Sequence, residues 1–501
     1  MSVPRRLIGM GLITGLVSAC TVGPDFRSPA LAPPFASLLR GDQRAGATLL
    51  TEAEPLDDWW SAFNDPVLSG LMGRVASQNL DVETSFARLE QARAQRRIAG
   101  GGRLPSVSAS ASYARARASS RGPSAVTHDG SSNYDVFEGG FDASWEIDLW
   151  GRVRRTVEAA TARYDAAGSG TRLALLVVEA ELARDYVMLR GSQSQLDVLR
   201  DNLEIAGRSV ALTRSRFANG VTTRLDVANA EAQASSIEAS IPRVEADRDT
   251  LVNAISLLLA LPPRALKTAL EPTGALPARL ETVSLGIPSE LLLRRPDIQQ
   301  AEHELHAATA EIGVAKADFL PRISLNGNLG SQAFQLSSFG GWSARQLSVG
   351  PAISLPVFQG GRLRGMLDLR TAEQQEAAIR YQGVVLAAWH EVDDALIGYS
   401  AEQRRRDSLA RTVEQNEVAF MVAERRYREG AVDFLNVLNV QKLLLEARSE
   451  VIRSNMDASV NLISLFKALG GGCKAGLSAI DDARRSSDDR SSDAKAKPSV
   501  D

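Results

Sequence analysis

SRFANGVTTRLDV occupies residues 215–227 and RRYREGAVDFLNV occupies residues 425–437, so the chain carries two versions of one short segment. Their central glycines, Gly220 and Gly430, are 210 positions apart. Each glycine follows one stretch with helical spacing and precedes another. A glycine directly after a helix adopts the left-handed conformation that ends it, without the steric cost of a side chain. Both segments therefore predict a tight turn between two long helices.

Two further pairs of segments repeat at a similar spacing. RLPSVSAS and FLPRISLN have their prolines, Pro105 and Pro321, 216 positions apart, and LVNAISLLLAL and SVNLISLFKAL have Ser256 and Ser464 208 positions apart. A period near 210 is too long for a solenoid unit and indicates a duplicated domain. We place the first repeat at residues 67–272 and the second at 273–472.

Very long helices are predicted before each turn. Residues 151–217 and 362–427 keep a near-heptad apolar spacing, and about 65 residues at 1.5 Å each give roughly 100 Å of helix. The apolar stripes contain Leu196, Leu199, Leu203, Ala206, Val210 and Phe217 in the first stretch, and Tyr381, Val385, Ala388, Val392, Ala395 and Tyr399 in the second. The stretches 222–261 and 432–469 are predicted to lead back from the turns as helices.

Three residues oppose this helical interpretation. Gly168 and Gly170 lie inside the first long stretch, and each is less favourable than Ala in a helix by about 1 kcal/mol. Pro242 is expected to kink the helix that leads back from the first turn.

Period-two alternation predicts strands before each long helix. In FDASWEIDL, residues 141–149, apolar side chains fall on one face and Asp142, Ser144, Glu146 and Asp148 on the other. A helix-like stretch at 67–100 precedes these strands. Similar alternation occurs at 104–118, where two arginines weaken it, and at 322–329 and 347–355. Four strands of about 9–12 residues result, paired through the Gly/Ser-rich connections 119–133 and 331–344.

Such strands fit two kinds of sheet. An outer-membrane barrel turns alternate side chains to lipid and to the lumen, and a half-buried soluble sheet alternates in the same way. Four strands cannot close a barrel that needs at least about eight, so a membrane-spanning version requires several chains. In a barrel, Asp142, Glu146 and Asp148 would line the lumen and favour cations. On a soluble sheet they would only form the solvated face.

The N-terminus resembles a secretion signal. Arg5 and Arg6 precede LIGMGLITGLVSA, an apolar stretch too short to cross a bilayer as a helix. Ser18 and Ala19 stand directly before Cys20 as in a bacterial lipobox. We therefore expect a signal peptide at 1–19, lipid attachment at Cys20 and a lipid-anchored segment at 20–66. The alternative is an ordinary signal peptide with an incidental cysteine.

Composition excludes several classes of protein. A chain of 501 residues exceeds one hydrophobic core, so several domains or an elongated shape are expected. The net charge of −3 gives no electrostatic footprint for nucleic acid. After the leader no stretch has 18 consecutive apolar residues, so any membrane span must consist of strands. Residues 473–501 are charged and Ser-rich, which predicts a disordered tail.

Enzyme and metal motifs are missing from the sequence. His303 and His306 stand three residues apart, whereas the zinc motif of metalloproteases needs two histidines four apart with a glutamate between them. No phosphate-binding loop, nucleophile elbow or paired-cysteine site occurs. We expect no catalytic residue, metal or cofactor.

Several motifs carry a family resemblance. CTVGPDFRSP, WWSAFNDPVL, WEIDLWGRVRR, LLLRRPDIQQAE and the two turn segments resemble the outer-membrane channel lipoproteins of bacterial multidrug efflux pumps, the OprM branch of the TolC-like family. The resemblance covers about residues 20–472. It implies a homotrimer whose chains complete one twelve-stranded barrel and a long α-helical, coiled-coil periplasmic tunnel, a mixed α/β fold.

The resemblance also implies location and partners. The lipid on Cys20 would anchor the N-terminus in outer-membrane lipid, and Thr21, where an inner-membrane retention signal carries Asp, fits that sorting. The tunnel would dock on a periplasmic adaptor protein and an inner-membrane, proton-driven RND-type transporter. Where relatives often have Trp after the last helix, this chain has Cys473.

The turns and the helix before the second turn contain the candidate sites. Relatives have an acidic ring about four turns before the tip, where this chain places Glu414, Asn416 and Glu417 as gate candidates. We expect the turns to be the adaptor-docking site, since short turns leave backbone groups unpaired; the alternative is that their glycines only reverse the chain. The docking candidates are Phe217, Gly220, Val221, Thr222, Leu225, Asp226, Tyr427, Gly430, Val432, Leu435 and Asn436.

Three functions compete at this point. The favoured one is a passive exit duct for drugs or other small molecules in a tripartite efflux pump. A duct of the same architecture could instead serve a type I protein secretion system, and a structural coiled-coil envelope lipoprotein would have no pore. The lipobox and the Gly-Pro-Asp segment favour efflux over secretion, and the four amphipathic strands oppose the filament.

Overall fold

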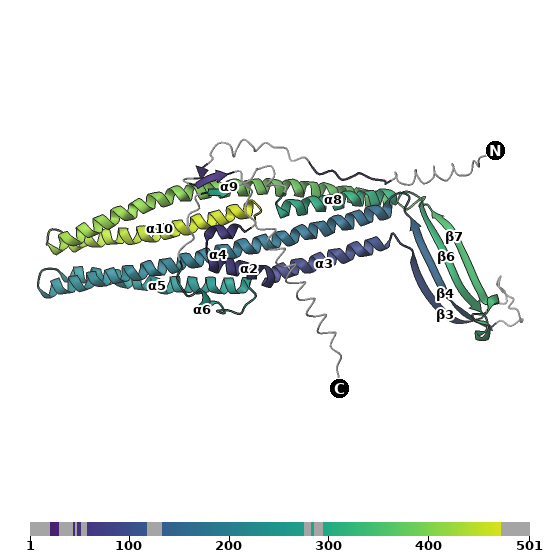
Figure 1. Ribbon diagram of the computed structural model, residues 1–501, viewed down its shortest axis with the longest axis horizontal. Coiled ribbons are helices and arrows are strands. Elements are labelled where there is room, and N and C mark those ends of the chain that lie inside the picture. The colour runs from purple at the N-terminus through teal and green to yellow at the C-terminus, as the bar shows by residue number, and fades with distance from the viewer. Residues whose placement is uncertain are drawn as a thin grey trace, which may run out of the picture. The chain divides into compact units, whose positions relative to one another are not determined.

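A computed structural model describes residues 21–29, 44–45, 48–51, 58–117, 133–274, 282–284 and 294–471. The chain divides into two compact units. Their helices and strands are labelled in Figure 1. The strand unit comprises Met1–Ala30, Arg88–Gly168 and Gln300–Gln382, and the hairpin unit comprises Leu31–Ala87, Ser169–Gln299 and Gly383–Asp501. Cys20, the tail from residue 473 and most of the 119–133 connection lie outside the described residues.

The strand unit contains one antiparallel sheet in the order β3-β4-β6-β7. Its strands are β3 (Ser106–Arg117), β4 (Asn133–Ile147), β6 (Arg322–Ala333) and β7 (Arg345–Ser354). The four predicted strands are confirmed, although β4 is longer than expected at 15 residues. The central pair, β4 and β6, joins the two repeats, and β3 and β7 form the sheet edges.

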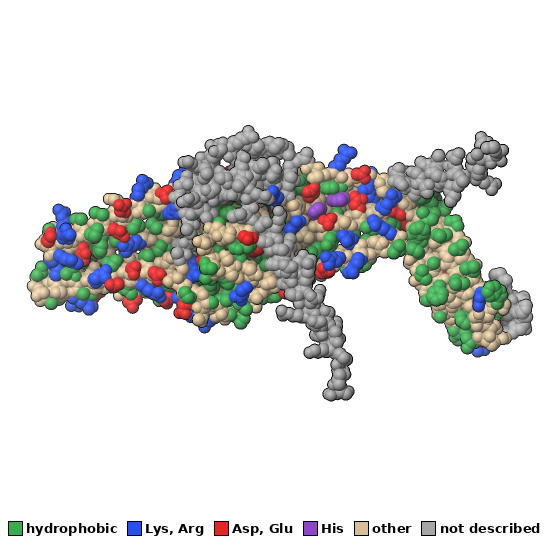
Figure 2. Space-filling view, viewed as in Figure 1, with side chains coloured by type: hydrophobic (Ala, Val, Ile, Leu, Met, Phe, Trp, Pro, Cys, Tyr) green, Lys and Arg blue, Asp and Glu red, His purple; other side chains and the backbone are tan. Residues whose placement is uncertain are grey.

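The apolar side chains of this sheet are exposed. Phe141 is 58% exposed, Leu329 54% and Leu347 80%, so no described part of the chain covers them. Figure 2 shows hydrophobic side chains spread over the sheet surface. In a half-buried soluble sheet, other parts of the same chain would cover the apolar side chains, whereas the described parts of this chain leave them exposed.

Two long helical hairpins confirm the prediction drawn from the turns. They consist of α4 (Arg152–Ala218) with α5 (Arg224–Leu258), and α9 (Arg362–Arg428) with α10 (Phe434–Ala468). The helices α4 and α9 have 67 residues each, or about 100 Å at 1.5 Å per residue. The helix α4 continues through Gly168 and Gly170, and α5 continues through Pro242.

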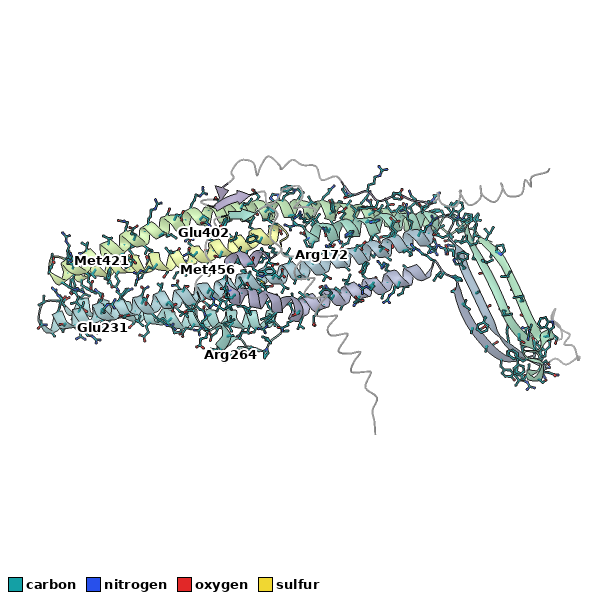
Figure 3. The ribbon with its side chains drawn as sticks, viewed as in Figure 1. Arg172, Glu231, Arg264, Glu402, Met421 and Met456 are labelled. Atoms are coloured by element: carbon teal, nitrogen blue, oxygen red, sulfur yellow. The ribbon has the colours of Figure 1, made fainter. Side chains whose placement is uncertain are left out.

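Small and apolar residues allow these helices to pack. Gly191 of α4 faces Met456 of α10 so closely that an added Cβ would lie 2.6 Å from the Met456 sulfur. Met456 is labelled in Figure 3. In the predicted stripes, Leu196, Ala388 and Tyr399 are buried, whereas Phe217 is 44% exposed. Among the described helices, none combines the length and the apolar composition needed to cross a membrane.

The helix expected at 67–100 is two helices, α2 (Pro66–Gln78) and α3 (Leu80–Gly101). The break falls at Asn79, whose Oδ1 accepts hydrogen bonds from the amides of Asp81 at 2.9 Å and Val82 at 3.1 Å. Its Nδ2 donates to the Leu258 carbonyl at 2.9 Å. Asn79 thus caps α3 and ties it to the end of α5, a contact that helical periodicity could not reveal.

Smaller elements complete the hairpin unit. They are a 3-10 helix (Trp59–Phe63), α6 (Lys267–Leu270) and a small sheet of β1 (Arg44–Ala45), β2 (Thr48–Thr51) and β5 (Thr282–Ser284). The parallel pairing of β2 with β5 was not predicted, because both segments are short. The helix α8 (Pro296–Ala317) opens the second repeat and contributes to both units.

The core of the hairpin unit contains an aromatic stack and a buried carboxyl group. Trp59 is fully buried and stacks on Phe466, with ring centres 5.4 Å apart. Glu179 of α4 is 1% exposed, and its Oε2 has no hydrogen-bond partner among the described residues. Burial, together with the nearby Asp58 carboxylate, raises the pKa of Glu179 well above its usual value.

Candidate docking tips and channel-lining residues

Both turns have the backbone geometry that the glycines predict. The φ angles of Gly220 and Gly430 are +72° and +78°. The Gly220 amide donates to the Phe217 carbonyl at 2.9 Å, and the Gly430 amide donates to the Tyr427 carbonyl at 3.0 Å. No other atom would lie within 4 Å of a Cβ on Gly220, so the backbone conformation, not crowding, requires glycine there.

Polar candidates at the turns cap the helices that follow. Thr223 and Asp226 form a capping box at the start of α5, and the Thr222 hydroxyl donates to the Asp226 carboxylate. Asp433 caps α10 by accepting from the Asn436 amide at 3.3 Å and from its side-chain nitrogen at 2.7 Å. These contacts fix the shape of the tips.

Arg216, which sequence reasoning missed, links the two tips. Its Nη1 donates to the Tyr427 carbonyl at 2.9 Å and to the Arg428 carbonyl at 3.1 Å. Its guanidinium lies 4.6 Å from the centre of the Tyr427 ring. A basic residue in the last turn of α4 was a visible signal, but it caps a different helix, α9, 211 residues away along the chain.

The docking candidates differ in exposure. Tyr427 is 3% exposed and belongs to a buried cluster with Phe434, Ala230 and Val437, so its side chain is not part of the surface. Val432 packs partly buried against the same cluster. The apolar candidates that the tips expose are Phe217 at 44%, Val221 at 61%, Leu225 at 67% and Leu435 at 53%.

The three gate candidates have different surroundings on α9. Glu417 forms an ion pair with Arg448 of α10 at 2.6 Å, and Asn416 donates its Nδ2 to the Leu443 carbonyl at 3.2 Å. Glu414 is exposed. Arg448 thus compensates the charge of Glu417, whereas Glu414 has no ion pair among the contacts of the described residues.

A second acidic group lies farther from the tips. Glu402 of α9, labelled in Figure 3, accepts from Arg405 at 3.1 Å and from the Ser454 hydroxyl. Burial and the Glu402 carboxylate raise the pKa of Asp457 on α10. Neither Glu402 nor Asp457 was singled out from the sequence.

The three lumen candidates are separated by the end of β4. Asp142 lies within the strand and accepts from the Asn328 side chain of β6 at 2.8 Å. Glu146 forms a double hydrogen bond with Arg152, at 2.8 and 2.6 Å. Asp148 lies beyond the strand, where it accepts from the amides of Val153 at 3.0 Å and Arg154 at 2.9 Å and so caps α4.

The alternation predicted for residues 141–149 therefore runs two residues beyond the end of β4 at Ile147. A left-handed Gly151, with φ of +83°, turns the chain from strand to helix, and the freed Asp148 carboxylate binds the exposed amides of the first helical turn. Glu146 and Asp148 accept hydrogen bonds from Arg152 and Arg154. Among the contacts of the described residues, Asp142 is thus the one of the three carboxylates that has no arginine as hydrogen-bond partner.

The segment after Cys20 is fixed against the junction of β4 and α4. The Val22 amide donates to the Trp150 carbonyl at 3.0 Å, and Asp25 forms an ion pair with Arg155. An added Cβ on Gly23 would lie 2.5 Å from the Cα of Gly313 in α8. The Gly-Pro-Asp-Phe sequence thus combines a close approach, an ion pair and an aromatic contact.

His306 has a structural role in this junction. Its ring stacks on Phe26 with centres 4.4 Å apart, and its Nε2 lies 2.9 Å from Glu158. No group of three His, Cys, Asp or Glu side chains suited to a metal ion occurs in the part of the chain that the structure describes.

Four strands, two duplicated helical hairpins and capped tips define the class of outer-membrane channel proteins. The family model described as outer membrane efflux protein matches residues 71–261 and 287–471, and the chain belongs to this family. It is the outer-membrane component of an efflux system.

Individual relatives match over almost the whole chain. The pyoverdine export outer membrane protein OpmQ of Pseudomonas putida is 33% identical, with 95% of this chain and 99% of the relative covered. The outer membrane protein OprJ of Pseudomonas aeruginosa is 32% identical, with 96% and 98% covered. The solved structure of the outer-membrane channel OprN superposes with a TM-score of 0.85 and 36% identity, covering 91% of this chain and 100% of OprN.

Proposed function

We propose that three copies of this chain form one passive duct through which small molecules leave the cell. The observation that carries the proposal is the open four-stranded sheet. Its edge strands β3 and β7 have 12 and 10 residues, so β7 of one copy can pair with β3 of the next along most of its length. Exposed edges of this length otherwise promote aggregation. Three copies supply twelve strands, enough to close a barrel.

We also propose that a lipid on Cys20 anchors each chain in the outer membrane. Thr21, the residue after Cys20, approaches Gly151 so closely that an added Cβ there would lie 2.8 Å from the Thr21 methyl group. This contact places Thr21 next to the turn between β4 and α4. The proposed lipid on the preceding residue would enter the same membrane as the strands.

The tips are proposed to dock on a periplasmic adaptor that connects the duct to an inner-membrane RND-type transporter. The exposed Val221, Leu225 and Leu435 supply the apolar contacts. The duct has no catalytic role, and the transporter supplies the energy. A relative exports pyoverdine, which favours small-molecule cargo over the protein cargo of a type I system.

Size and export measurements test these proposals. Light scattering on the purified full-length chain in detergent is expected to give a trimer of the 53.8 kDa chain, corrected for the cleaved leader and bound detergent. Deleting the gene is expected to raise small-molecule drug accumulation and to leave protein secretion unchanged. A monomer would refute the shared barrel, and loss of a secreted protein with normal drug export would favour type I secretion.

A further inference from the structure

Among the described residues of one chain, an arginine at the end of one long helix caps the end of the other long helix at one place, where Arg216 of α4 binds α9. Arg216 of the first hairpin caps the second hairpin by binding the Tyr427 and Arg428 carbonyls. The last carbonyl groups of any helix lack partners within the helix and carry partial negative charge. The C-terminus of α4 is a second helix end of the same kind, and it receives no such arginine from its own chain in the contacts of the described residues.

The internal duplication supplies the missing residues at matching positions. At the spacing of 210 residues, Arg216 corresponds to Arg426 and Tyr427 corresponds to Phe217. The two turns share their hydrogen bonds: the Val221 amide donates to the Arg216 carbonyl and the Ala431 amide to the Arg426 carbonyl, each at 2.9 Å. The arginine and the aromatic residue therefore have the same local position in both tips.

The counterparts differ in exposure in a consistent way. Tyr427, which Arg216 covers, is 3% exposed, but its counterpart Phe217 is 44% exposed. Leu212 packs partly buried against the cluster that contains Tyr427, but its counterpart Val422 is 52% exposed. Arg426 is exposed as well. Within one chain, the first hairpin thus supplies the arginine of the contact and the second hairpin supplies the aromatic residue. The corresponding arginine of the second hairpin and aromatic residue of the first hairpin stay exposed.

We infer that Arg426 of each copy caps α4 of the next copy by donating to the Phe217 and Ala218 carbonyls, with its guanidinium over the Phe217 ring. In this arrangement Val422 packs near that ring, as Leu212 packs against the cluster that contains Tyr427. This inference rests on the proposed trimer. It makes Phe217 a contact between copies instead of an adaptor contact.

A second copy fits this surface better than a different protein does. The contact is head to tail, with an arginine on one side of the chain and an aromatic helix end on the other, and such an interface closes into a ring when copies are related by rotation. The seam inside the chain shows that these two surfaces match. An arginine over an aromatic ring adds a favourable contact to the hydrogen bonds. Six arginines would then join six tips, alternately within and between copies.

Cysteine cross-linking with a short bismaleimide tests the inference in the full-length purified chain, in a Cys473→Ser background. The reagent is used because the contact is bridged by a long arginine side chain, whereas a direct disulfide needs Cα atoms within about 7 Å. The test pair is Phe217→Cys with Arg426→Cys. The matched control is Arg216→Cys with Tyr427→Cys, which should link within one chain. In the register control, Phe217→Cys with Arg425→Cys, the second cysteine lies about 100° away around the helix.

After reaction with the bismaleimide, we expect the test pair to shift from monomer to covalent trimer on denaturing gels. The within-chain control should close without a change in chain number, and the register control should stay monomeric. A second test pair, Phe217→Cys with Val422→Cys, should also link copies, which guards against damage from losing Arg426.

The results separate this inference from the proposed function. A chain that is trimeric by light scattering and forms the within-chain control cross-link, but links copies with neither test pair, would overturn the Arg426 contact and leave the trimer intact. Equal trimer formation by the register control would also overturn it, because the contact would then lack the proposed geometry. A chain that is monomeric throughout would overturn both.

Discussion

Replacing Arg216 by alanine should loosen the second tip selectively. The substitution removes two hydrogen bonds from a charged donor, at 2.9 and 3.1 Å, and a guanidinium 4.6 Å from the Tyr427 ring. Hydrogen bonds to charged groups contribute about 1.5–3 kcal/mol. Water can replace the arginine at this exposed tip, so we expect the lower value, about 1.5 kcal/mol, for the whole contact.

That loss corresponds to about a tenfold increase in local opening. Native-state hydrogen exchange measures it at the amides of Gly430 and Ala431, which hold the turn by bonds to the Tyr427 and Arg426 carbonyls. The melting temperature should change little, because the tip can open without unfolding the hairpin.

The neighbouring Arg214 provides a matched control. It lies in the same helix and forms an ion pair with Glu231 of α5 at 2.5 Å, but the two side chains are 64% and 45% exposed. Exposed pairs contribute about 0–1 kcal/mol, so Arg214→Ala should leave exchange at Gly430 and Ala431 unchanged. Unchanged exchange in Arg216→Ala, or the same increase in both variants, would refute the capping role.

Four further predictions concern other parts of the chain. Gly430→Val forces a β-branched residue into a left-handed conformation. The variant should still form trimers but should lose adaptor cross-linking and drug export together. The control Gly207→Ala has open space around its Cβ and should keep both. Asp148→Ala removes the α4 cap and should cost about 1 kcal/mol of stability in thermal unfolding, whereas Asp142→Asn should leave stability unchanged and lower cation preference in planar-bilayer recordings. Because the pKa of Glu179 is raised in the folded chain, the unfolded chain releases this proton at a lower pH than the folded chain does. The free energy of unfolding therefore falls as the pH rises above 4.5. The melting temperature of Glu179→Gln should rise relative to that of the wild type between pH 4 and 8, and a constant difference would contradict this prediction. Intact-mass measurement should find a lipid on Cys20, and Cys20→Ser with a cleavable signal should still yield trimers; an unmodified Cys20 would remove the anchor.

Local features of the fold could be predicted well from the sequence. The glycines at 220 and 430 identified both turns, because one backbone position needs a left-handed residue. Period-two alternation identified all four strands, although it ran past the end of β4. The sequence DLWGR contains an Asp shortly before a helix start, which is a known capping signal, so the end of β4 at Asp148 was within reach.

Contacts between distant segments could not be predicted in this way. Arg216 binds α9, Asn79 binds the end of α5, and Arg295 of the RRPD motif binds the Ala468 carbonyl at 2.8 Å. Each partner is more than 170 positions away, and local periodicity holds no information on such pairs. Two sequence-based interpretations of Phe217 conflicted, since its heptad position predicts burial and its place in the turn predicts a docking surface. The structure shows it 44% exposed, and in the proposed trimer its packing partner belongs to the next copy.

The β4–β6 pairing at the centre of the sheet has a consequence for how such a protein can arise and assemble. Each half of the duplicated chain contributes one strand hairpin and one helical hairpin, and eleven residue pairs from Phe137–Ala333 to Ile147–Ile323 join the halves. Two separate half-chains would have to meet in solution to form that seam, and six would be needed for the strands of three whole chains. Fusion of the halves makes this pairing independent of concentration and halves the number of pieces in the ring. A scarce membrane protein with this design needs two association steps instead of the five that six half-chains would need.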